Sequence, residues 1–126
     1  MKTKARPTKT TPLRRSPCAV ANTLDRVGDK WSLLLVRDML AGKRTYGQFL
    51  ESPEGIPTNI LAVRLRRLED FGIITRSAYQ ERPVRFAYSL TAEGKQLGRV
   101  LRALADWGLE NISGTKKDLG PGSSAR

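Results

Sequence analysis

Histidine is absent from this 126-residue chain, and cysteine occurs once. Without histidine there is no Ser-His-Asp or Cys-His catalytic arrangement and no histidine-ligated metal site. With one cysteine, a thiolate cluster and an intramolecular disulfide are excluded as well. The adjacent acids Glu69 and Asp70 cannot flank one substrate, because neighbouring helical residues point in different directions. We therefore expect no enzyme, no bound metal and no cofactor.

Long apolar stretches are also missing, since the longest apolar run, residues 33–36, is far shorter than the ~20 residues of a membrane span. The basic N-terminus has no apolar core of the kind that a secretory signal needs, although its threonine-rich, acid-free composition leaves a transit peptide as an alternative. A single cysteine suits a reducing compartment. We expect a cytoplasmic protein without a membrane segment.

Acidic residues are few, because 12 Asp and Glu stand against 23 Lys and Arg, for a formal charge of +11. Residues 1–15 contribute +6 and residues 113–126 contribute +2, so the rest of the chain carries +3. We expect residues 1–16 to form a disordered basic arm, residues 113–126 a flexible tail and residues 17–112 one folded domain. The charge is compatible with a polyanionic partner, but the tails supply most of it.

Apolar residues at helical spacing predict the first half of the domain. Four helices are expected, over residues 20–27, 30–40, 45–52 and 58–71. Asp29 can cap the second helix and Thr58 the fourth. The side chains expected to face inward are Trp31, Leu34, Leu35 and Met39, then Tyr46, Phe49 and Leu50, then Ile60, Leu61, Leu65, Leu68 and Phe71.

A hairpin and a last helix complete the predicted fold. Residues 73–80 and 84–90 read as strands joined by a short turn, with Val84, Phe86, Tyr88 and Leu90 on the buried face of the second strand. Thr91 can cap a last helix that carries two adjacent apolar rows, a stripe wider than contact with one small domain requires. The order indicates a mainly α winged helix-turn-helix domain with a small β-hairpin.

In that order, the fourth helix is the one that lies in the major groove of DNA. Its face opposite the leucines carries Thr58, Asn59, Ala62, Val63, Arg66 and Arg67. Arginine matches guanine, asparagine matches adenine, and small apolar groups contact the thymine methyl. The alternative is a solvated face on which Arg66 pairs with Asp70, four residues on. For Arg64, nearer the core edge, an ion pair or a snorkelling stem is at least as strongly expected as a DNA contact.

Further basic residues lie on the hairpin and before the short helix. Arg76, Arg82 and Arg85 on the hairpin suit DNA backbone or a minor groove, or alternatively protect an exposed sheet edge. Lys43 and Arg44 suit phosphate, or alternatively belong to a plain surface loop.

Four segments together resemble the HxlR-type winged-helix transcription regulators: CAVANTLDRVGDKWSLLLVRDML, TYGQFL, GIPTNILAVRLRRLEDFGII and RFAYSLTAEG. The resemblance runs from about Cys18 to Gly108. Ile-Pro-Thr-Asn stands where that family more often has a Ser-Pro-Lys-like start, which leaves the DNA half-site sequence open.

The resemblance implies homodimers in which the first and last helices of two subunits pack together. The residues that it assigns to this contact are Val20, Leu24, Leu97, Val100, Leu101, Leu104 and Trp107. The alternative is that the stripe on the last helix covers its own core. A dimer places two recognition helices about one DNA turn (~34 Å) or a multiple apart on a near-palindromic operator.

Cys18 is a candidate redox-sensing residue. Some members of the family that this chain resembles respond to oxidants or electrophiles through a cysteine at this position. A helix N-terminus and the nearby Arg14 and Arg15 favour a thiolate, whereas the alternative is a small buried residue without reactivity.

We therefore expect a sequence-specific, homodimeric regulator that binds double-stranded DNA. The first alternative is a non-specific nucleic-acid-binding or architectural protein driven by the basic tails, and the second is a winged helix used for protein contacts. A small-molecule effector is left open.

Overall fold

The computed structural model describes residues 15–116. Its elements are α2 (Ala19–Val27), α3 (Ser32–Leu40), α4 (Tyr46–Leu50), α5 (Thr58–Asp70), β1 (Ile74–Glu81), β2 (Val84–Leu90) and α6 (Ala92–Asn111). They confirm the predicted winged helix-turn-helix order, with the first strand displaced by one residue. Apart from residues 15–16 and 113–116, the predicted basic arm and C-terminal tail lie outside the described residues.

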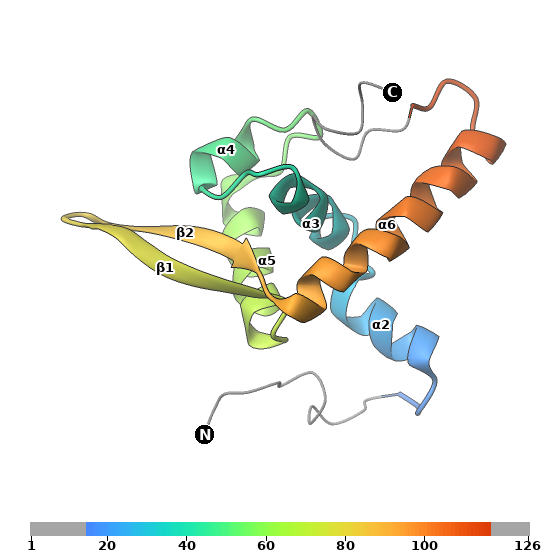
Figure 1. Cartoon of the computed structure of the whole chain (residues 1–126), viewed down its shortest axis with the longest axis horizontal. Coiled ribbons are helices and arrows are strands. Elements are labelled where there is room, and N and C mark those ends of the chain that lie inside the picture. The colour runs from blue at the N-terminus through green and yellow to red at the C-terminus, as the bar shows by residue number, and fades with distance from the viewer. Residues whose placement is uncertain (1–14, 117–126) are drawn as a thin grey trace.

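Helix α3 lies at the centre of the fold (Figure 1). Val36 of α3, Phe49 of α4 and Leu61 of α5 are all fully buried in one apolar cluster. Tyr88 of β2 packs its ring against Phe49, with ring centroids 6.3 Å apart, and burial raises the pKa of its hydroxyl. The cluster also contains Val27, Leu35, Met39, Ile56, Leu65, Leu68, Ile73, Ile74 and Leu101.

Three residues lie elsewhere than predicted. Leu50 is 38% exposed because it ends the five-residue helix α4 at the surface. Val84 is 56% exposed because it opens β2 at the far end of the hairpin. Leu101, expected at a dimer contact, is buried in the core of its own chain, since α6 contacts α3.

Side-chain caps fix where the helices begin. Trp31 occupies the N-cap position of α3, but Asp29 Oδ2, two residues earlier, accepts hydrogen bonds of 3.0 Å from the N–H groups of Trp31 and Ser32. Partial burial opposes ionisation of Asp29, but the hydrogen bonds from Ser32 and Trp31 outweigh it and lower the carboxyl pKa. Thr91 caps α6 by accepting from the Gly94 N–H, as predicted.

The β1–β2 hairpin, here called the wing, extends away from the helices (Figure 1). The strands are antiparallel, with Ile74 opposite Leu90 and an irregularity in register between Ala78 and Gln80. At its base, Gly94 of α6 packs so closely on the Ile73 carbonyl that a Cβ there would collide with it. No helix within residues 15–116 is long and apolar enough to cross a membrane.

Candidate DNA-binding surface

One side of α5 gathers most of the residues predicted to face DNA. Asn59, Ala62, Val63 and Arg66 are exposed and recur at helical spacing, so they share one face. Thr58, also exposed, begins the helix. The opposite face is buried through Leu61, Leu65 and Leu68. Within residues 15–116, the Arg66 side chain forms no hydrogen bond or ion pair, so the alternative pairing with Asp70 is not made.

The N-terminus of α5 has no side-chain cap. The prediction that Thr58 caps it is wrong, because Thr58 is already the first helical residue and Pro57 occupies the N-cap position. The first turn also contains no acidic residue. The backbone N–H groups and the positive end of the helix dipole are therefore available to an anion such as phosphate.

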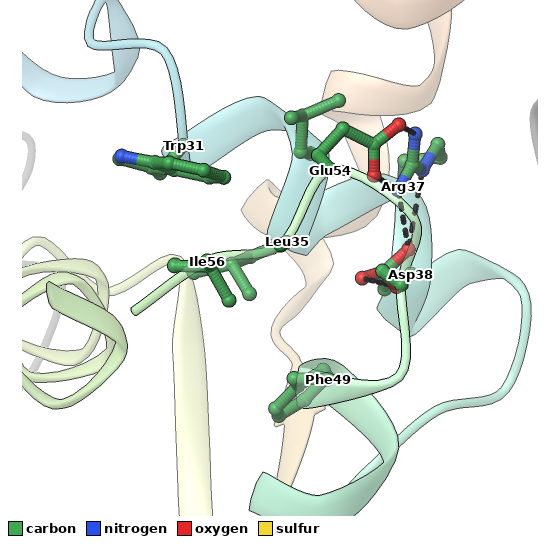
Figure 2. Close-up of a pocket in the computed structure, with 10 residues that line it drawn as sticks. Trp31, Leu35, Arg37, Asp38, Phe49, Glu54 and Ile56 are labelled. Atoms are coloured by element: carbon green, nitrogen blue, oxygen red, sulfur yellow. Dashed lines mark hydrogen bonds and ion pairs between the residues drawn. The ribbon is translucent and has the colours of Figure 1, made fainter. Parts of the chain in front are cut away.

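A buried charge network ties the segment before α5 to α3. Figure 2 shows Arg37 between two carboxylates, those of Asp38 and Glu54. Arg37 Nη1 and Nη2 donate to Glu54 at 2.9 and 2.8 Å, and Arg37 Nε and Nη2 donate to Asp38 Oδ1 at 3.1 and 2.9 Å. The Ser52 hydroxyl donates to Asp38 Oδ2 at 2.7 Å.

These hydrogen bonds also shift the titration of the pair. Those to Glu54 raise the pKa of Arg37, and those from Arg37 lower the pKa of Glu54. The network borders a pocket lined on its apolar side by Trp31, Leu35 and Ile56 (Figure 2). Ile56 is itself buried, so the chain enters α5 from a fixed point.

The buried edges of α5 are held by arginines. Arg64 Nε lies 3.3 Å from Asp29 Oδ2, which confirms the ion-pair alternative for Arg64. Arg67 was predicted to face DNA, but its Nη2 donates to the Asp25 carbonyl at 3.2 Å, and the side chain is partly buried against α2. The structure thus separates Arg67 from the exposed face that holds Arg66.

The three wing arginines have different surroundings. Arg76 lies with its guanidinium carbon 4.2 Å from the centre of the Phe86 ring and its Nε 3.5 Å from Glu69. Arg82 and Arg85 are exposed at the end of the wing, and their side chains form no hydrogen bond or ion pair to another described residue. Of the three wing arginines, these two have guanidinium groups without a partner among the described residues.

The basic residues before α4 are engaged within the fold. Lys43 Nζ donates to Ser52 Oγ at 2.8 Å, which joins it to the buried charge network. The Arg44 carbonyl accepts a hydrogen bond from the Tyr88 N–H at 2.8 Å, and Arg44 Nη2 donates to Ser89 Oγ at 3.1 Å. Arg44 thereby links the helix-turn-helix to the wing. Neither contact was predictable from the loop sequence.

The residues expected at a dimer contact divide into two groups. Val20 and Leu24 on α2 and Leu104 and Trp107 on α6 are more than half exposed, with Trp107 at 61%. Leu97 packs against the core and Leu101 is buried within it, while Val100 is half-buried. Leu109 and Ile112 extend the exposed apolar set at the end of α6.

Cys18 is the N-cap residue of α2 and is exposed, which contradicts the buried alternative. Its N–H donates to Ser16 Oγ at 3.1 Å. Arg15, one of the two cations expected near the thiol, pairs instead with Asp25 at 2.8 Å, and Arg14 lies outside the described residues. Within the described range, no cluster of three or more acidic or cysteine side chains could hold a metal ion.

Sequence reasoning missed two sets of residues that shape this surface. Arg26 stacks on Phe71, 5.0 Å from the ring centre, although the two are far apart in sequence and no local pattern connects them. Arg37 and Asp38 gave a usable signal, because adjacent charges inside an apolar helix at the centre of a fold must find buried partners.

Comparison with known proteins agrees with this geometry. The family model described as HxlR-like helix-turn-helix matches residues 26–116. The uncharacterised HTH-type transcriptional regulator sll1512 of Synechocystis is 42% identical over 94 residues, which cover 71% of this chain and 70% of the relative. YdeP of Bacillus subtilis, with the same description, is 36% identical over 91 residues, 72% of this chain and 71% of the relative.

A solved structure points the same way. The redox regulator HypR in its oxidised form superposes with a TM-score of 0.68 at 34% identity, covering 76% of this chain and 99% of that one. The family match confirms the resemblance found in the sequence. The chain belongs to the HxlR-like helix-turn-helix family of transcriptional regulators.

Proposed function

We propose that this protein is a sequence-specific regulator that binds double-stranded DNA as a homodimer, with α5 in the major groove. The observation that carries the proposal is the exposed face of α5, where Asn59, Ala62, Val63 and Arg66 lie together on a helix whose other face is buried. A solvated face needs no such mixture of amide, small apolar and guanidinium groups.

Each group on this face has a base-edge partner. Arg66 offers a fork of donors to guanine O6 and N7, and Asn59 pairs in a bidentate way with adenine N6 and N7. Ala62 and Val63 fit against thymine methyl groups. Thr58 and the uncapped N–H groups at the start of α5 bind a neighbouring phosphate, which fixes the register of the helix.

The wing makes the second contact. Arg82 and Arg85 at its end reach the DNA backbone or the adjacent minor groove, where the negative potential attracts guanidinium groups. Lys43, Arg44, Arg67 and Arg76 belong to our expected DNA contacts, but their intramolecular bonds favour roles in holding α5 and the wing in place.

Dimerisation joins the exposed apolar residues of α2 and α6 to those of a second copy. Val20, Leu24, Leu104 and Trp107 would be costly to leave in water together, and burying them in a two-fold contact removes that cost. Such a dimer presents two α5 helices to a near-palindromic operator. A transcriptional regulator of this kind acts in the cytoplasm.

Cys18 is the proposed sensor. Its thiol is exposed at the start of α2, and HypR, a structural relative, is described as a redox regulator. With diamide as the oxidant, two Cys18 thiols of a dimer lose two electrons and two protons in total and form one disulfide, and the N=N bond of diamide takes up both electrons and both protons to become a hydrazine. We expect diamide to release operator DNA from the protein and to leave the Cys18→Ser variant bound. If diamide releases operator DNA equally from the wild-type protein and the Cys18→Ser variant, Cys18 is not the sensor.

In vitro selection of random DNA duplexes by the full-length protein at near-physiological salt tests the main proposal. We expect a near-palindromic motif whose half-sites lie about one or two helical turns apart. A matched selection with the Arg66→Ala variant should lose preference at one position of each half-site. Recovery of unenriched DNA by the wild-type protein would instead support non-specific binding through the basic tails, and recovery of none a protein-binding role.

A further inference from the structure

We propose that Arg67 is a positioning residue that sets the orientation of α5 on α2, rather than a DNA contact. It acts together with Arg26 and Phe71, and these three residues are here called the arginine–phenylalanine clamp. The inference rests on the proposed function, since the effect of the clamp is measured on operator binding.

Within the clamp, a hydrogen-bond donor from α5 binds the C-terminal end of α2. The last carbonyls of a helix have no partner within it, and the end carries partial negative charge. Arg67 Nη2 donates to one of these, the Asp25 carbonyl, at 3.2 Å. The Asp25 carboxylate is occupied by Arg15 at 2.8 Å, so Arg67 meets the backbone and not the side chain.

Two guanidinium groups from different helices lie over the Phe71 ring. Arg26 of α2 lies 5.0 Å from the ring centre and Arg67 of α5 lies 5.9 Å from it. Arg26 is itself fixed, because its Nη1 donates to the Asn22 carbonyl at 2.9 Å. The contact of the Arg26 cation with the Phe71 ring joins α2 to the end of α5 and so restricts sliding and rotation between the two helices.

The exposed neighbour Arg66 supplies the contrast. The Arg66 side chain is exposed and has no partner within residues 15–116, whereas the Arg67 side chain is partly buried and makes two contacts. The leucines on the buried face of α5 and the Arg64–Asp29 pair remain when the clamp is removed, so the domain stays folded. What changes is the angle at which the base-reading face meets DNA.

Base contacts tolerate little misorientation, whereas phosphate contacts made by long side chains tolerate more. Loss of the clamp should therefore weaken binding to the operator and spare binding to unrelated DNA. A phosphate contact behaves otherwise: its loss weakens both duplexes and reduces the salt slope by about one.

The test compares Arg67→Met, Phe71→Leu and their combination in the full-length protein, with Arg66→Met as the matched control. Binding to the selected operator and to a scrambled duplex is measured by fluorescence anisotropy over a series of KCl concentrations, below the melting temperature of every variant. We expect each single clamp variant to weaken operator binding roughly tenfold, in the range of coupling between sites. The double variant should add little to this, with the scrambled duplex and the salt slope unchanged.

Several outcomes overturn the inference. Equal weakening on both duplexes with a lower salt slope makes Arg67 a phosphate contact, and equal weakening with an unchanged slope means partial unfolding. If Arg67→Met or Phe71→Leu binds the operator as tightly as the wild-type protein, the clamp does not position α5. If the wild-type protein itself does not distinguish the duplexes, the proposed function fails and the inference fails with it. If it does distinguish them and a clamp variant gives one of the contrary outcomes above, the inference fails and the proposed function stands.

Discussion

Replacing Arg37 by methionine should destabilise the domain strongly, because it strands a buried carboxylate. Arg37 supplies two hydrogen bonds to Asp38 and two to Glu54. Methionine keeps most of the apolar stem and removes all four. Asp38 is 6% exposed and would retain only the hydrogen bond from Ser52 among these partners, with the Lys43 ammonium reaching it only through that hydroxyl.

The two partners of Arg37 differ in what their loss costs. Removing one member of a buried ion pair costs about 3–5 kcal/mol, and that range applies to the Arg37–Asp38 contact. The Glu54 side chain is 35% exposed and regains water, so its share is about 1 kcal/mol or less. We expect Arg37→Met to lose about 3–5 kcal/mol of unfolding free energy and Glu54→Gln to lose about 1 kcal/mol.

A second substitution should repair part of the damage. Asparagine at position 38 removes the stranded charge and keeps an acceptor for the Ser52 hydroxyl. The Arg37→Met, Asp38→Asn double variant should therefore be more stable than Arg37→Met by about 1–2 kcal/mol. Asp38→Asn in the wild-type background should have the opposite sign, since it leaves Arg37 short of a partner.

Urea unfolding followed by tryptophan fluorescence measures these differences, and Trp31 lines the pocket beside the network. Protomer concentration must be held constant, because any dimer adds to the apparent stability. If Arg37→Met unfolds the protein outright, Glu54→Gln and the double variant still provide the comparison. Two results would refute the stranded-charge reasoning: a loss of unfolding free energy below about 1 kcal/mol for Arg37→Met, or a double variant that is less stable than Arg37→Met.

Three further predictions follow from the same structure. Gly94→Ala should lower the free energy of unfolding in urea by about 1–3 kcal/mol, because its Cβ collides with the Ile73 carbonyl. Gly98→Ala, whose Cβ meets only ordinary contacts, should raise it by up to about 1 kcal/mol. Equal effects of the two substitutions would contradict this packing. Arg66→Ala should cost about 1–3 kcal/mol on the selected operator and relax one base position, while uniform weakening on all duplexes in a binding assay would reassign it to phosphate. The lowered pKa of Glu54 gives stability that is complete above its ordinary value of 4.5 and is lost as pH falls through the lower folded pKa. Stability measured against pH should then fall less steeply in the acid range for Glu54→Gln than for the wild-type protein, and identical slopes would contradict it.

Local signals in the sequence were sufficient for the element order. Apolar spacing located the helices, alternation located the second strand, and Asp29 and Thr91 marked two helix starts through side chains that accept from backbone N–H groups there. The prediction of a cap at Thr58 is wrong because Pro57 occupies the N-cap position. Where the helix begins here depends on how the preceding loop is anchored in the fold. The prediction that Leu101 lies at a dimer contact differs from the structure because the apolar stripe on α6 faces its own core at some positions and solvent at others. Helical spacing alone does not tell which positions are buried.

The sequence by itself determined that residues 58–71 form an amphipathic helix with a base-compatible outer face, because helical geometry fixes which residues share a side. Only the tertiary structure decided which arginines are free. Arg66 and Arg67 are adjacent and chemically identical, yet one is exposed and the other donates to the end of α2. The difference arises because contacts between α2 and α5 join residues more than 40 positions apart, and no local pattern records which partner a long, flexible side chain will meet.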